Sequence, residues 1–111
     1  MKQHAITKYL NDNKQLIGLS DWTFTYDNTP IMKEHTLAST IIDADEKEGL
    51  VRVHKQFHTL KTQKQHNILL HELVHTRVRV CELKQNLQKA ANEEELVNDI
   101  TRGLLQTHHI V

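Results

Sequence analysis

HNILLHELVH, residues 66–75, lies in a long segment without proline or glycine, where apolar residues recur at the spacing of a helix. Helix residues four apart share a face, so His71 and His75 can direct ring nitrogens at one metal ion. Glu72 borders this face without having to bind the ion. Its carboxylate is then free to take a proton from a metal-bound water. The spacing predicts a zinc site with its general base.

The H-E-x-x-H pattern by itself is also compatible with an ordinary helix, because the chain contains nine histidines. A catalytic zinc needs a third protein ligand and an open position. Metzincins place a third histidine six residues after the second, behind a glycine, but here Val78 and Cys81 stand at those positions. Cys81 is a ligand only if the helix breaks before it, and is otherwise a small buried hydrophobe.

The rest of the chain predicts a single α+β domain, residues 1–111. Residues 2–18 have helical spacing with Gly18 as a stop, and Trp22–Tyr26 alternates like a strand. Two β-branched runs, 36–43 and 50–56, flank the acidic turn DADEKEG and predict a hairpin. Helices are expected over 63–81 and 93–106, with a break somewhere in 82–92. Together these elements predict a small, mainly antiparallel sheet of about three strands beside the helices. The apolar stripe expected on the last helix consists of Leu96, Val97, Ile100, Leu104 and Leu105.

Composition narrows the classes of function. Lysine plus arginine equals aspartate plus glutamate at fourteen each, which disfavours a nucleic-acid surface. A single cysteine excludes an internal disulfide and fits a reducing compartment. The N-terminus does not look like a secretory signal, and no apolar run is long enough to cross a membrane. We therefore expect a cytoplasmic protein that binds neither nucleic acid nor membrane, as a monomer or small homo-oligomer.

A second motif, Glu95-Leu96-Val97-Asn98-Asp99, follows His75 after nineteen residues. It resembles the glutamate helix of the gluzincins, the thermolysin-like zinc metallopeptidases, in which the third ligand precedes a small polar residue and an aspartate. By that resemblance Glu95 is the third zinc ligand and Asp99 is the carboxylate that orients His71. Glu95 and Asp99 are also i and i+4, and a carboxylate behind a ligand histidine fixes its tautomer.

Two alternatives remain for this segment. Asn92 and Glu95 also have the spacing of a capping box, in which the acids merely begin a helix. Glu94 is the alternative ligand, one residue out of register.

The resemblance covers residues 67–105 and is specific to the clan. The whole chain is similar to the minimal gluzincins of archaea, bacteria and phages, and to the ImmA/IrrE-type regulatory proteases. This resemblance implies a small sheet beside the zinc helix. The edge strand of that sheet is expected to bind a substrate segment by strand addition. The strand at 50–56 is nearest in sequence to the zinc helix, but the sequence does not establish which strand is the edge.

Zinc peptidases usually carry a side chain that stabilises the oxyanion. His108 and His109, just past the glutamate helix, are candidates, as are Tyr26, His54 and Arg102. No motif surrounds any of them, and the sequence favours the simpler explanation for each, a surface polar residue.

Two hypotheses of different classes follow. The first is a zinc-dependent peptidase acting on a peptide or protein substrate, with ligands His71, His75 and Glu95 and with Glu72 as general base. The second is a regulatory domain that binds a protein partner and in which zinc is structural or no longer catalytic.

Overall fold

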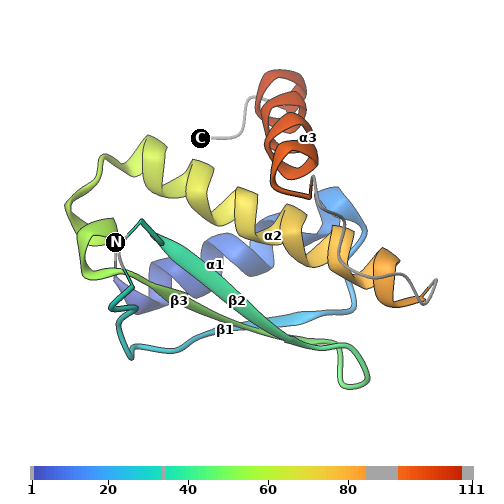
Figure 1. The fold of residues 1–111 in the computed structure, drawn as a ribbon, viewed down its shortest axis with the longest axis horizontal. Coiled ribbons are helices and arrows are strands. Elements are labelled where there is room, and N and C mark those ends of the chain that lie inside the picture. Colours follow the sequence, from blue (N-terminus) through green and yellow to red (C-terminus); the bar gives the residue numbers. More distant parts are fainter. Residues whose placement is uncertain (1, 34, 85–92, 109–111) are drawn as a thin grey trace.

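A three-stranded sheet with helices on one face forms the body of the protein (Figure 1). The computed structural model describes residues 2–33, 35–84 and 93–108. The elements run in the order α1 (Gln3–Asn13), β1 (Thr23–Tyr26), β2 (Ala38–Asp43), β3 (Glu48–Val53), α2 (Thr62–Lys84) and α3 (Glu93–His108), with short 3-10 helices at Lys14–Ile17 and Lys55–Thr59. The α+β class predicted from the sequence is confirmed.

The N-terminal helix α1 packs through one apolar face. Ile6, Tyr9 and Leu10 are its buried residues. The chain then tightens into the 3-10 turn and stops at Gly18, whose φ of 74° is left-handed. Glycine adopts this conformation without steric cost, so the predicted stop is where the helical region ends.

The sheet has three strands, as predicted, in the order β1-β3-β2, and it contains one antiparallel and one parallel pair. The acidic turn does join β2 and β3 as an antiparallel hairpin, but β1 pairs with β3 in parallel. This is possible because the segment between β1 and β2 carries the chain past β3, so that β1 and β2 become the two edges. The strand nearest in sequence to α2 is therefore the central one, and β2 is the edge strand that contacts α2.

The covered face of the sheet receives α1 over β1 and α2 over β2 (Figure 1). Alternate residues of β3, Val51 and Val53, enter the core with Phe24 of β1. Gly49 lies opposite Phe24, and a Cβ at Gly49 would come within 2.6 Å of the phenyl ring. The absence of a side chain at this position lets the ring lie across the strand pair.

Helix α2 forms the second layer with buried Leu69, Leu70 and Leu73, and α3 packs against it (Figure 1). On α3, Val97 is fully buried, whereas Leu96 is 43% exposed and Ile100 is also exposed. The predicted stripe is confirmed for Val97, Leu104 and Leu105, which are buried or packed against the core, and is wrong for Leu96 and Ile100. Among the described residues, no helix is both long and apolar enough to cross a membrane. The break predicted within 82–92 falls after Lys84, largely outside the described residues.

Candidate metal centre

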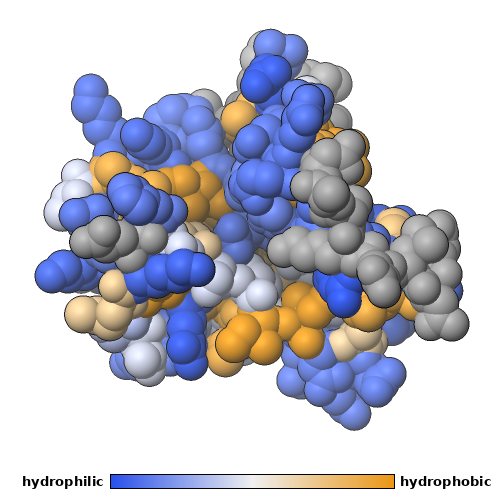
Figure 2. All heavy atoms as spheres, in the orientation of Figure 1, coloured by the Kyte–Doolittle hydropathy of each residue, from blue (hydrophilic) through white to orange (hydrophobic). Residues whose placement is uncertain are grey.

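A groove crosses the molecule between edge strand β2 and helix α3, and α2 forms its floor. Two cavities of about 690 and 640 Å³ make up the groove, and both are lined by Glu72, His75 and Glu94. On the face drawn in Figure 2, hydrophilic residues gather in the hollow between α3 and β2. The H-E-x-x-H residues therefore lie at the middle of the groove.

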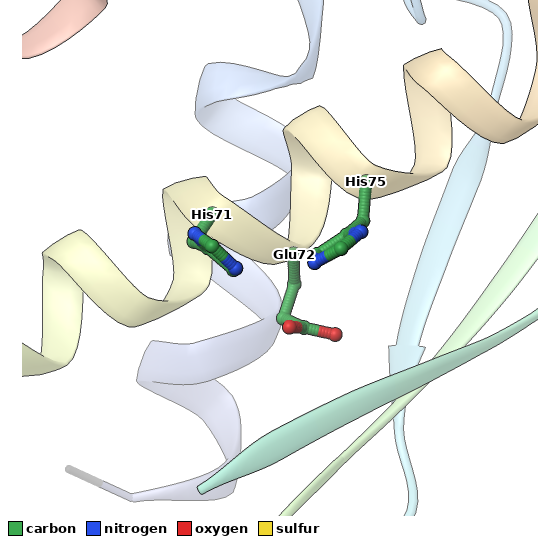
Figure 3. A group of neighbouring side chains, drawn as sticks. All are labelled: His71, Glu72 and His75. Atoms are coloured by element: carbon green, nitrogen blue, oxygen red, sulfur yellow. The ribbon is translucent and has the colours of Figure 1, made fainter. Parts of the chain in front are cut away.

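His71 and His75 project from successive turns of α2 toward the groove, with Glu72 between them on the side facing β2 (Figure 3). The two imidazole rings lie edge to face with their centroids 4.7 Å apart. Ligand atoms of His71, Glu72 and His75 all lie within 4.8 Å of one another, so this group could hold a metal ion. The helix interior predicted around residues 66–75 produces this convergence, because i and i+4 positions share a face.

Glu94, the second residue of α3, brings a carboxylate to both histidines. Its Oε1 lies 2.7 Å from His71 Nε2, and its Oε2 lies 2.9 Å from His75 Nε2. Two imidazole nitrogens and a glutamate oxygen are a donor set found at catalytic zinc sites. Donor atoms on one tetrahedral zinc lie about 3.3 Å apart, given bonds of about 2.0–2.1 Å. The Glu94 side chain is 67% exposed and free to withdraw by the required half ångström or so.

Glu93 approaches the other nitrogen of His75. Its Oε1 lies 3.0 Å from His75 Nδ1, and its side chain is only 5% exposed. Both ring nitrogens of His75 thus meet carboxylates. A neutral ring has one N–H to donate, so a cation between Nε2 and Glu94 resolves the conflict while Nδ1–H donates to Glu93. The residues present therefore fit a metal ion.

Glu93→Gln is expected to weaken zinc binding about 10- to 100-fold, because the carboxylate behind His75 fixes its tautomer and raises its basicity. It should not destabilise the metal-free fold, because Oε2 of Glu93 is buried without a hydrogen-bond partner. Zinc affinity by chelator competition and the melting temperature in excess chelator measure the two effects. Glu95→Gln, one residue along, is the matched control. A purely structural Glu93 would give the opposite result, with a lower melting temperature and unchanged affinity.

Glu72 is held by the edge strand. Thr40 Oγ1 of β2 donates to Glu72 Oε1 at 2.8 Å, and the glutamate is 7% exposed. Burial raises the pKa of the Glu72 carboxyl above its ordinary value, while the bond from Thr40 and the nearby histidines oppose that rise. A raised pKa suits a group that must both accept and return a proton near neutrality.

The structure places Glu94, and not Glu95 or Asp99, beside the two histidines. Glu95 is exposed, and Asp99 lies 3.6 Å from Arg102 in an exposed ion pair. Successive helix residues are rotated by about 100°, so turning α3 by one position replaces Glu95 with Glu94. The buried Val97 fixes that rotation. The carboxylate that supports a histidine is Glu93 on His75, not Asp99 on His71, and the run of three glutamates gave no signal to separate them.

Of the predicted oxyanion stabilisers that the structure describes, only Arg102 lies at the groove. Tyr26 lies in β1, at the opposite edge of the sheet, and packs against the core. His54 caps the second 3-10 helix, where its side chain accepts a hydrogen bond from Gln56 N–H. Arg102 does line the first cavity. His109 and the side chain of His108 are outside the described residues.

Cys81 and His35 also bear on the composition of the site. Cys81 is not a member of the metal-binding group found among the described residues. His35, which no motif singles out, lines the first cavity from a left-handed backbone with φ of 64°. Only the placement of the segment before β2 across the groove brings it there.

The centre thus combines two histidines on one helix, a glutamate on another, and a buried carboxylate held by an edge strand. Comparison with known proteins finds no matching family model, curated protein or solved structure. What the centre does must therefore be inferred from its own geometry.

Proposed function

We propose that the protein is a zinc-dependent peptidase whose metal ligands are His71, His75 and Glu94. The observation that carries the proposal is the Glu94 carboxylate facing the Nε2 atoms of both histidines, with the Glu72 carboxylate fixed beside them. Such a donor set leaves the fourth position of a tetrahedral ion for water, as catalytic zinc requires.

The roles of the side chains follow from their contacts. A zinc ion held by His71, His75 and Glu94 would supply a water of lowered pKa and polarise the substrate carbonyl. Glu72 would act as general base toward the attacking water and as general acid toward the leaving amine. Thr40 holds Oε1 of Glu72 and thereby fixes the plane of the carboxylate, so the second oxygen remains free to take the proton.

The free edge of β2 supports a peptide as the substrate. Its far side pairs with β3, so the groove-side backbone groups are available to an added strand. A peptide paired there would pass directly beneath Glu72, which β2 contacts through Thr40. This agrees with the strand addition that the resemblance to gluzincins implies.

Hydrolysis of fluorescently labelled, unfolded casein tests the proposal. Zinc-loaded protein is expected to release fluorescence, excess chelator to stop it, and added zinc to restore it. Chelation should also lower the melting temperature by about 10 °C or more, relative to protein in free zinc at about a thousand times its dissociation constant. A protein that holds zinc but never cleaves casein, nor the defined peptides described below, contradicts the proposal.

A non-catalytic zinc domain that acts through a protein partner is the second candidate. One observation favours it: among the described residues, neither Tyr26 nor His54 lies at the groove to stabilise an oxyanion. Under this alternative, chelation lowers the melting temperature as above, but no cleavage accompanies the zinc-bound form.

A further inference from the structure

The two halves of the groove differ in chemistry. Ile68, Leu37 and Leu105 give the first cavity hydrophobic walls. Its cations are solvent-exposed, and Arg102 is paired with Asp99. The second cavity is lined instead by Lys33, Arg79 and the hydroxyl residues Thr36, Ser39, Thr40 and Thr76. A peptide lying across the metal centre meets a hydrophobic surface on one side and a cationic, hydroxyl-rich surface on the other.

Arg79 is the distinctive residue of the second cavity. It continues the His71, His75 series by four more residues and so lies on the same face of α2. Its Nη1 is buried and forms an ion pair with Glu82 Oε1 at 3.7 Å, which is too long for a hydrogen bond. The side chain as a whole is 37% exposed and lines the second cavity, where the guanidinium can donate to an incoming carboxylate.

The carboxylates in the same cavity already have partners. Glu72 accepts from Thr40, Glu93 contacts His75 Nδ1, and Glu94 faces both Nε2 atoms. Within the described ranges, none of these three forms an ion pair with Arg79 or Lys33. Arg79 is paired with Glu82, which does not line this cavity, at a distance too long for a hydrogen bond, and Lys33 is exposed. Both cations can therefore still bind an anionic group that enters the groove.

We propose that Arg79, assisted by Lys33, forms a subsite for an acidic side chain of the substrate. The inference rests on the peptidase function proposed above. Both β2 and α2 run from the first cavity toward the second. Leu37, just before β2, and Lys64, near the start of α2, line only the first cavity. Ile42 and Arg79, further along the same two elements, line only the second. Antiparallel addition to β2 would place the residues before the cleaved bond in the second cavity.

The position of the acidic residue follows from helix and strand dimensions. Arg79 is one turn beyond His75, about 6 Å along the axis, and an extended peptide advances about 3.3 Å per residue. The acidic side chain is therefore expected about two residues before the cleaved bond.

A library of synthetic, unstructured peptides, with products identified by mass spectrometry, tests the subsite. Wild-type protein should favour aspartate or glutamate at that position. In matched peptides that differ only by glutamate or glutamine there, Arg79→Gln should lower the ratio of kcat/KM values about tenfold. Arg79→Lys should keep part of the preference. The ratio is independent of how much of each variant is folded.

Arg77→Gln is the matched control, because Arg77 is on the same helix but lines a separate cavity beside Gly18. It should leave the ratio unchanged. Equal ratios for wild type and Arg79→Gln overturn the subsite while leaving the peptidase proposal intact.

Capture of the same library on the zinc-loaded Glu72→Gln protein separates the two proposals further. If wild type cleaves no peptide, the peptidase proposal fails. Retention of acidic peptides that is lost in Glu72→Gln/Arg79→Gln would still support the anionic subsite. The absence of such retention would overturn it.

Discussion

Glu94→Ala is expected to lower zinc affinity by more than about a hundredfold, because it removes the proposed third ligand, and even residues behind the ligands contribute 10- to 100-fold. The Glu94 carboxylate contacts both ring nitrogens that face the groove, and the remaining histidines are on a single helix. Zinc per chain, measured after equilibration with a chelator of known affinity, gives the effect directly.

Glu95→Ala is the control for this experiment. Both glutamates are exposed acids in the first turn of α3, so both substitutions alter the charge near the helix N-terminus equally. Glu95→Ala should bind zinc like wild type. If Glu95→Ala loses the metal and Glu94→Ala keeps it, the register inferred from the sequence motif is right and the one in the structure is not.

Glu72→Gln is expected to lower kcat for peptide cleavage about a thousandfold while zinc stays bound, because a general base contributes 10²–10⁴ to the rate. Glutamine keeps the size of the side chain and can still accept from Thr40. Cleavage of labelled casein, or of the best library peptide, and zinc content are measured on the same preparation. Unchanged cleavage would rule out Glu72 as the base.

The pKa of Glu72 also predicts how Glu72→Gln changes the stability of the metal-free protein. The folded-state pKa of Glu72 is raised above its unfolded value, so the folded protein binds more protons and loses stability as pH rises through that pKa. Replacing the titrating group by an amide removes this loss. At neutral pH the metal-free Glu72→Gln protein should melt no lower than the metal-free wild type, so any lost activity cannot be assigned to unfolding.

Much of the fold was predictable because local signals agreed with the tertiary structure. The apolar spacing of α1, the left-handed stop at Gly18 and the acidic hairpin turn all depend on near neighbours. The pairing of β1 with β3 was not predictable, because strand order depends on how the segment after β1 crosses the sheet. No residue pattern within a single strand encodes that path.

The candidate site divides in the same way. His71, Glu72 and His75 share one helix, so their convergence follows from helix geometry alone. Glu94 comes from a second helix, and its selection over Glu95 depends on the rotation that buries Val97. Glu93, Glu94 and Glu95 have the same functional group, so the sequence cannot show which of them is the ligand. Only the packing of α3 distinguishes them.

The placement of the donors on two helices has a mechanical consequence. The imidazoles are fixed to one another by the hydrogen-bonded turns of α2, whereas the third donor is on a separate helix. The distance from the third donor to the imidazoles therefore depends on the separation of α3 from α2 as well as on the Glu94 side chain. If the centre binds an ion as proposed, displacement of α3 would leave only the two histidines as ligands. Metal binding and the docking of α3 on α2 would then be thermodynamically coupled.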